Sequence, residues 1–271
     1  MKTLVTHLLP HLDDICGLWL VKRYLPGWSQ ARTVFLTRQS SQMATYKKQP
    51  VDSDPQIIHV GVGRGRFDEH KGDVGKSASL LVFEYLLKIN KIPAADRAPL
   101  QNLVEAIRQE DTGELKTLPH RNLFLGSLLS AIESSKERTR IGLTLLDAAL
   151  EKYRGEIKLL QDFKKARSFQ TPWGKGVALK TAEGGADALA YQRGFVIALI
   201  LNPVGGWRMF RSRPDSKVNL TKIYQAVKGK EPQADWFLHH SGKLLLCGSS
   251  TAAKVRMSKL SLQEMIELIK K

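Results

Sequence analysis

Residues 6–15 read THLLPHLDDI, and this segment decides the expected fold. The residues just before it, 3–6 (TLVT), predict a short buried strand, and apolar residues at helical spacing over 13–24 predict a helix behind it. Residues 32–37 and 56–62 are rich in β-branched side chains and predict two further strands. Strands that alternate with helices form a mainly parallel sheet, so we expect the chain to begin with an α/β domain.

The remainder of the chain predicts a helical stretch and then a second domain. Residues 79–89 are apolar nearly all round, as in an interior helix, and the pattern over 94–162 is almost wholly helical. One long amphipathic helix is predicted over 143–169. Short strands are then predicted within 174–185, 195–201, 207–213 and 243–250, with helices at 220–227 and 260–270. We therefore predict an N-terminal domain over 1–137, a helical linker over 138–168 and a smaller α/β domain over 169–271.

The positive charge is concentrated in the second half. The chain has 271 residues and a net charge of +16. Residues 1–115 hold 15 Lys and Arg against 13 Asp and Glu, a net charge of +2, whereas residues 116–271 hold 27 against 13, a net charge of +14. A basic domain concentrates polyanions, and its affinity for them falls with salt. Nucleic acid or a nucleotide is the expected partner; charge alone leaves solubility or a loose attraction to a membrane surface as alternatives.

Nothing in the sequence predicts a membrane span or a secretory signal. The longest clearly apolar run, 195–201, is too short to cross a bilayer, and two acids follow the N-terminus before a signal core could form. Cys16 and Cys247 lie far apart and form neither a CxxC pair nor a disulfide framework. We expect a soluble cytoplasmic protein with no membrane partner, and the sequence leaves its oligomeric state open.

Three short motifs carry candidate metal ligands. Residues 6–15 place two imidazoles and two carboxylates at the carboxyl end of the first predicted strand, the edge at which open α/β sheets bind ligands. The alternative is that His7 and His11 are ordinary loop residues and that Asp13 or Asp14 caps the helix. Two further motifs are FDEHK (67–71) and EDTG (110–113). Each by itself is also typical of charged residues exposed to solvent.

The order of these motifs resembles that of the DHH phosphoesterases and manganese pyrophosphatases. Their first motif is roughly H-x-N-P-D-x-D-x-I; His7, Pro10, Asp13 and Ile15 match it, and His11 stands in place of its first Asp. Their second motif is a strand ending in Asp, where this chain has His59. In their Asp-His-His motif, Asp68 and His70 match and Glu69 occupies the first His position; Asp111 matches the Asp of the fourth motif.

A further resemblance, to the DHH-associated domain, extends the match over most of the chain. FRS (210–212), VNL (218–220) and HHSG (239–242) are similar to its S-L-R-S, D-V-S and G-G-G-H elements, although the glycine run is only partly kept. The resemblance implies that Arg211 and the segment 239–242 hold the phosphate or terminal nucleotide of the substrate. The substrate-binding residues expected on this basis are Arg211, Arg213, His239, His240 and Gly242.

The departures from the family pattern change the expected metal chemistry. In the resembled site a carboxylate bridges two manganese ions, and the neutral imidazole of His59 cannot bridge in that way. Three histidines suit Zn²⁺ or a similar transition ion, whereas oxygen ligands suit Mn²⁺ or Mg²⁺. The expected metal ligands are His7, His11, Asp13, His59, Asp68, Glu69 and Asp111. Asp14 and His70 are expected to act in catalysis, by orienting ligands or contacting the phosphate.

The sequence therefore predicts a two-domain α/β protein with a mainly parallel, DHH-type N-terminal domain. The expected activity is metal-dependent hydrolysis of phosphodiester bonds in the interdomain cleft, on nucleic-acid ends, single-stranded nucleic acid, short oligonucleotides or nucleotides. The alternative is a DHH-fold protein that binds nucleic acid or nucleotides without turnover. A pyrophosphatase is disfavoured, because so small a substrate needs no basic domain.

Overall fold

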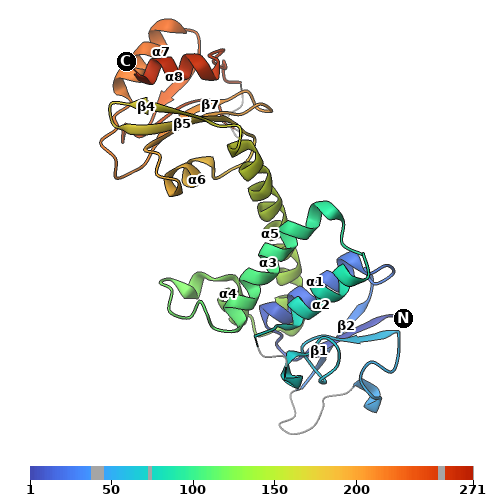
Figure 1. The fold of residues 1–271 in the computed structure, drawn as a ribbon. Helices are drawn as coiled ribbons and strands as arrows, with labels where there is room; N and C mark the ends of the chain where they lie inside the picture. The colour runs from blue at the N-terminus through green and yellow to red at the C-terminus, as the bar shows by residue number, and fades with distance from the viewer. Residues whose placement is uncertain (38–45, 73–74, 250–253, 271) are drawn as a thin grey trace. The chain divides into compact units, whose positions relative to one another are not determined.

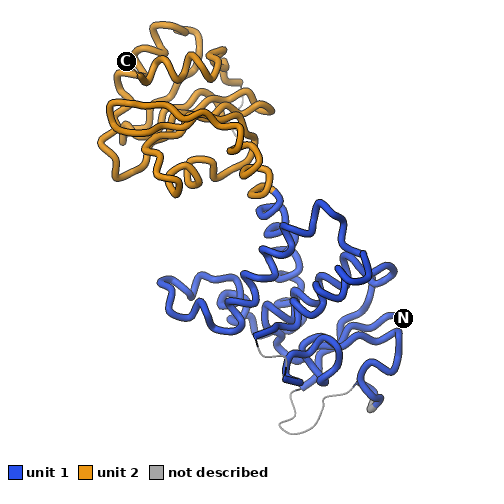
Figure 2. The backbone as a smooth tube through the Cα atoms, viewed as in Figure 1, with its two compact units in different colours: residues 1–154 blue, residues 155–271 orange. Residues whose placement is uncertain are grey.

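The computed structural model describes residues 1–37, 46–72, 75–249 and 254–270, which form two compact units. Unit 1 comprises residues 1–154 and unit 2 residues 155–271 (Figure 2). The division falls within helix α5 (Ser135–Phe163), which overlaps most of the linker expected over 138–168.

Unit 1 contains a parallel sheet in the strand order β2–β1–β3. The central strand β1 (Thr3–His7) pairs with β2 (Arg32–Leu36) on one side and with β3 (Ile57–His59) on the other. Val5 lies opposite His59 in this register, so β1 continues for two residues beyond the end of β3. The parallel strands confirm the expected α/β class, and they direct the ends of β1, β2 and β3 to one edge of the sheet.

Helices accompany this sheet and continue after it. Helix α1 follows β1, α2 precedes the helical region, and short 3₁₀ helices lie in the connections (Figure 1). The bounds are α1 (Leu12–Tyr24), η1 (Tyr46–Lys48), η2 (Glu69–Lys71), α2 (Ala78–Lys88), α3 (Ala94–Asp111), η3 (Arg121–Leu123) and α4 (Leu125–Ser130).

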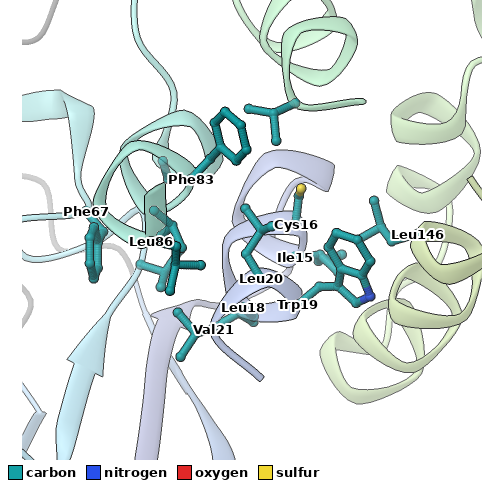
Figure 3. Close-up of a cluster of buried hydrophobic side chains, with 14 of the residues drawn as sticks. Ile15, Cys16, Leu18, Trp19, Leu20, Val21, Phe67, Phe83, Leu86 and Leu146 are labelled. Atoms are coloured by element: carbon teal, nitrogen blue, oxygen red, sulfur yellow. The ribbon is translucent and has the colours of Figure 1, made fainter. Parts of the chain in front are cut away.

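Helix α1 is the centre of the hydrophobic core of unit 1. All of its residues from Leu12 to Val21 are buried, because other elements cover it on several sides. Figure 3 shows Phe83 and Leu86 of α2 facing α1 from one side and Leu146 of α5 facing it from the other. A helix covered in this way needs no amphipathic pattern, and each fully buried large aliphatic side chain contributes about 1.5–3 kcal/mol to stability.

A partly buried polar network joins α1, α3 and α5 at the C-terminal end of α1. The hydroxyl of Tyr24 donates to Oδ2 of Asp96 at 2.9 Å, and Nε of Arg154 donates to Oδ1 of the same carboxylate at 2.9 Å. Asp96 is buried, so both contacts compensate its lost hydration. Burial, together with the hydrogen bond to Asp96, raises the pKa of Tyr24 to about 12.

Unit 2 contains a mixed sheet in the order β4–β5–β6–β7–β9–β8, in which β5 and β6 are parallel and the other neighbours antiparallel. Successive residues of β6 serve two separate cores: Ala198 and Ile200 pack with α6, while Ile197 and Leu199 face α7 and α8 (Figure 1). The bounds are β4 (Arg167–Thr171), β5 (Gly174–Lys180), α6 (Ala186–Gln192), β6 (Ile197–Leu201), β7 (Arg208–Ser212), α7 (Thr221–Lys230), β8 (Trp236–Leu238), β9 (Leu244–Cys247) and α8 (Leu262–Lys270).

The long helix predicted over 143–169 is too long by several residues. It ends at Phe163, and residues 167–171 form β4 instead. Phe169 lies opposite Gly176 of β5, where the missing side chain leaves room for the phenyl ring. Sheet pairing at this position overrides the helical pattern of the sequence. None of the helices in the described part of the chain has the length and apolar character that crossing a membrane requires.

Candidate metal centre

The first part of the site lies where β1 ends and α1 begins. His7 is the last residue of β1, His11 is the N-cap of α1, and Asp14 lies in the first turn of that helix. Oδ2 of Asp14 accepts the His11 backbone N–H at 2.8 Å and lies 2.8 Å from Nε2 of His7. One ligand atom from each of these three residues lies within 4.8 Å of the others. The sheet edge therefore gathers imidazole nitrogen and carboxylate oxygen in a largely buried position.

Asp13 points from the same turn toward the start of α2. Its two carboxylate oxygens accept the backbone N–H groups of Ala78 at 2.7 Å and Ser79 at 3.1 Å, and the Ser79 hydroxyl also donates to it. Burial and the neighbouring charge of Asp14 nevertheless raise the pKa of Asp13 to about 7. Asp13 thus accepts the first two N–H groups of α2, whose N-cap is Ser77, and also adds a carboxylate to the site. The alternative that Asp13 or Asp14 caps α1 is confirmed for Asp14, which forms a capping box with His11.

Glu69 and Asp111 bring two more carboxylates to Asp13. One oxygen from each of the three lies within 4.8 Å of the others, although the residues come from η2, the end of α3 and α1. Burial raises the pKa of both Glu69 and Asp111, and the charge of Asp14 raises each further. Among the described residues, Oε2 of Glu69 is buried without a hydrogen-bond partner. Converging carboxylates with raised pKa values need either protons or a cation between them.

Asp68 and His70 form a pair beside this carboxylate group. Oδ1 of Asp68 lies 2.7 Å from Nδ1 of His70 and also accepts the His70 backbone N–H at 3.0 Å, while Oδ2 accepts the N–H of Arg64 at 2.6 Å. Asp68 is buried, whereas the His70 side chain is 49% exposed. A fixed carboxylate therefore orients an imidazole that a substrate can reach. Asp68, Glu69 and His70 form a further group with ligand atoms within 4.8 Å of one another.

Gly61 allows the backbone to approach the site closely. Its φ angle of +64° is in the left-handed region, and a Cβ at this position would lie 1.8 Å from Oδ1 of Asp14. Any side chain would displace the carboxylate that contacts His7 and His11.

His59 does not join His7 and His11 in any of these groups. It lies two residues back from the sheet edge that His7 reaches, in register with Val5, which belongs to a small apolar cluster. Its ring is buried, burial lowers its pKa, and neither ring nitrogen has a hydrogen-bond partner among the described residues. The predicted triad of imidazoles is thus reduced to a pair at this edge.

Arg138 is a structural part of the site that the sequence motifs did not indicate. It is 5% exposed, and its guanidinium donates to the backbone carbonyls of Leu9 at 3.0 Å, Ser130 at 2.7 Å and Ile132 at 2.8 Å. Ser135 Oγ accepts the N–H of Leu9 at 2.9 Å. The start of α5 therefore fixes the loop between His7 and His11. No local pattern could reveal a contact across 129 residues of sequence.

The predicted substrate residues of unit 2 gather near one end of its sheet. His239 and Gly242 belong to the turn between β8 and β9, in which the N–H of Gly242 donates to the His239 carbonyl at 2.9 Å. The imidazole rings of His239 and His240 lie 4.0 Å apart between centroids. Ser212 donates its backbone N–H to the Lys243 carbonyl at 2.9 Å, which brings residues 211–213 beside this turn.

The two arginines at this end already have acidic partners. Arg211 Nε lies 2.9 Å from Oδ2 of Asp187, and Arg213 Nε donates to Oδ1 of Asp215 at 2.6 Å. Both guanidinium groups are partly exposed, so an incoming phosphate would compete with these carboxylates.

Comparison with known proteins identifies similar structures at low sequence identity. No family model and no curated protein sequence matches the chain. A structure of the exonuclease RecJ bound to manganese is 11% identical, with a TM-score of 0.29, and the match covers 99% of this chain and 89% of that one. The DHH domain of a member of the s1p family of ribosomal proteins is 12% identical, with a TM-score of 0.32, over 90% of this chain and 82% of that one.

A third match is RecJ from Thermus thermophilus in complex with Mg²⁺, with 11% identity and a TM-score of 0.30. The chain spans about half of that protein, since the match covers 99% of this chain and 49% of the other. At such TM-scores, activity has to be derived from the site itself.

Proposed function

We propose that the chain is a metal-dependent phosphodiesterase that acts on nucleic-acid ends or short oligonucleotides. The observation that carries this proposal is the convergence of Asp13, Glu69 and Asp111, three carboxylates from separate elements that share one neighbourhood and have raised pKa values. Keeping them together without a cation costs free energy, and a divalent cation relieves that cost.

The donor atoms fit a divalent ion. Asp13, Glu69 and Asp111 would hold it with oxygen ligands, and His7, His11 and Asp14 offer a mixed set of nitrogen and oxygen beside them. The oxygen group suits Mn²⁺ or Mg²⁺, and the imidazoles suit Zn²⁺ or another transition ion. Such an ion, when bound, supplies a Lewis acid and lowers the pKa of water for attack on phosphorus.

The residues around this set have roles that follow from their contacts. Asp14 orients His7 and the N-cap His11 through one oxygen. His70 is held at Nδ1 by Asp68, which leaves Nε2 as the atom that can donate a proton to the leaving oxygen or to a phosphate oxygen. The buried Asp68 carboxylate fixes the orientation of this imidazole. The basic second half of the chain supplies attraction for a polyanionic substrate.

The test is a metal panel with a matched pair of variants. Purified chain is assayed on short single-stranded RNA, single-stranded DNA and a cyclic dinucleotide with Mn²⁺, Mg²⁺, Zn²⁺ or Co²⁺, alongside metal analysis of the protein. Glu69→Gln keeps the shape of the Glu69 side chain but removes its charge, and Oε2 of Glu69 has no hydrogen-bond partner among the described residues. Activity should fall at least about 100-fold, because changing even a residue that only supports a metal ligand costs up to about that factor. Glu84→Gln, on an exposed ion pair with Lys76, should leave activity unchanged.

One observation favours a second candidate, a nucleic-acid binding protein without turnover. Both oxygens of Asp13 already accept hydrogen bonds from α2, so this residue has a structural role that needs no metal. Salt-sensitive binding with no cleavage by any of the four ions would favour the binding protein. Cleavage that Glu69→Gln abolishes would exclude it.

A further inference from the structure

A cavity of about 310 Å³ opens beside the carboxylate group, entirely within unit 1. His11, Asp13 and Asp111 form part of its wall, so the candidate metal ligands face the cavity directly. The rest of the wall comes from the end of α3, the segment around η3, α4 and the start of α5. No sequence motif pointed to the part of the wall within residues 115–130, which lies between the fourth motif and the predicted linker.

The cavity has an apolar wall and a polar wall, and the polar wall carries both cations and the carboxylates of Asp13, Glu110 and Asp111. The apolar side chains are Pro10, Leu12, Ile107, Leu115, Phe124 and Leu129. Phe124 is half-buried at the N-cap of α4, so an aromatic face is available. A volume of this size is at the lower end of the range for ligand pockets, about 300–1,000 Å³, and suits one small ligand rather than a length of polymer.

The basic residues of the polar wall are Lys116, Arg121 and Arg138, and the charge of Lys116 acts on Asp111. In the described part of the chain none of the three has an ion pair with a carboxylate. Arg138 is buried and its hydrogen bonds go to backbone carbonyls, so its charge has no counter-ion there. Burial lowers the pKa of Arg138, in keeping with a cation held out of water. An anionic group in the cavity would balance this charge.

We propose that this cavity is a subsite for a single nucleoside unit of the substrate. The base would pack against Phe124 and the apolar wall, and its phosphate would lie toward the basic residues and the carboxylate group. This deepens the proposed phosphodiesterase function and rests on it for the identity of the ligand. It places recognition of the terminal nucleotide in unit 1, in addition to the phosphate contacts expected of unit 2.

The test compares ligands that share a phosphate and differ in the base. Binding of adenosine 5′-monophosphate, uridine 5′-monophosphate and ribose 5-phosphate to the full chain is measured by calorimetry in the presence of Mg²⁺. If the base occupies the cavity, the nucleotides should bind about tenfold or more tightly than ribose 5-phosphate. Stacking of one base on an aromatic side chain increases affinity by about this factor. Equal affinity of all three ligands would overturn the proposal.

Two variants and a control locate the effect. Ser127→Trp should fill the cavity, and Phe124→Ala should remove its aromatic wall; each should bring nucleotide affinity down to that of ribose 5-phosphate. Ser29→Trp, in an exposed turn of unit 1 outside the cavity, should behave as wild type. Unfolding curves check that each variant is folded. If Ser127→Trp and Phe124→Ala both fold and keep wild-type nucleotide preference, the base does not bind here.

Failure of this subsite and failure of the proposed activity give different results. A chain that cleaves oligonucleotides, is inactivated by Glu69→Gln and shows no preference for a base is a phosphodiesterase without the subsite. A chain that cleaves nothing, but binds nucleotides in a way that Ser127→Trp abolishes, has the subsite without the activity.

Discussion

The two units hold their candidate functional residues in different ways. In unit 1 they come from the ends of several elements and range from buried Asp13 to exposed Asp111, and burial and neighbouring charge raise the pKa values of Asp13, Glu69 and Asp111. In unit 2 the arginines lie partly exposed at the end of a sheet and already form ion pairs with Asp187 and Asp215. Shifted pKa values in a partly buried cluster are typical of a reactive centre, whereas exposed paired charges contribute little each. The comparison predicts chemistry in unit 1 and attraction of the substrate in unit 2.

The largest expected effect tests this division directly. Asp13→Asn in unit 1 should lower kcat by about 10²–10³-fold, because it removes a charge from the carboxylate group. Arg211→Ala in unit 2 should mainly raise KM, by about tenfold at most, since its charge is already shared with Asp187. Steady-state kinetics on a short oligonucleotide measures both. A loss of kcat in Arg211→Ala as large as that in Asp13→Asn would break the comparison.

The next effect concerns glycines with similar backbone angles in the two units. Gly61→Ala and Gly185→Ala both place a side chain at positive φ, +64° and +82°, which costs about 1–2 kcal/mol of stability. A Cβ on Gly61 would collide with Asp14, whereas nothing lies within 4 Å of one on Gly185. Gly61→Ala should therefore also weaken Mn²⁺ binding by about 10–100-fold. Calorimetric titration with Mn²⁺ measures this, and equal affinities for the two variants would show that Asp14 has no part in the site.

A smaller effect concerns the pH dependence of unfolding. Tyr24 has a folded pKa of about 12, above the value of about 10 for an unperturbed tyrosine, so the folded chain holds this proton more tightly than the unfolded chain. The stability it contributes is complete below pH 10 and is lost as pH rises toward 12. Tyr24→Phe should lower the free energy of unfolding by about 1 kcal/mol at pH 8 and make the decline between pH 10 and 12 less steep. Urea unfolding over this range checks both, and an unchanged slope would contradict the assignment to Tyr24.

The smallest expected effect belongs to the surface of unit 2. Arg213→Ala should weaken binding of single-stranded oligonucleotides of every sequence alike and reduce the slope of log K against log salt by about 1 or less. Lys88→Ala, in the last turn of α2 in unit 1, is the matched removal of a positive charge and should leave the slope unchanged. Fluorescence titrations at several salt concentrations give both slopes. A larger change in Lys88→Ala would move the nucleic-acid surface to unit 1.

The sequence predicted the parallel sheet because its strands and the first two helices have strong local patterns. The strand at 3–6 and the helix behind it fix the edge at which His7, His11 and Asp14 meet. Local pattern failed where pairing decides the structure: β4 has a helical pattern but pairs with β5, and β8 is too short to predict. The sequence did not predict helix α6, because the two glycines just before it, Gly184 and Gly185, indicated only the end of a strand.

The site was predictable as a set of motifs and only partly as a geometry. The order of the motifs predicted Asp13, Glu69 and Asp111 as ligands of one metal site. In the structure one carboxylate oxygen of each lies within 4.8 Å of the others. The same reasoning included His59, because sequence cannot tell that β1 extends beyond β3. Arg138 and the cavity wall around α4 were missed, since their contacts depend on tertiary packing between distant segments.

The carboxylate of Asp13 connects the site to the main chain of α2. Its oxygens accept the amide protons of Ala78 and Ser79, the first two residues of that helix. A cation that draws charge from these oxygens weakens both hydrogen bonds, so occupancy of the site and fraying of the helix are linked equilibria. Hydrogen–deuterium exchange at those two amides would therefore report binding of the proposed ion without any substrate.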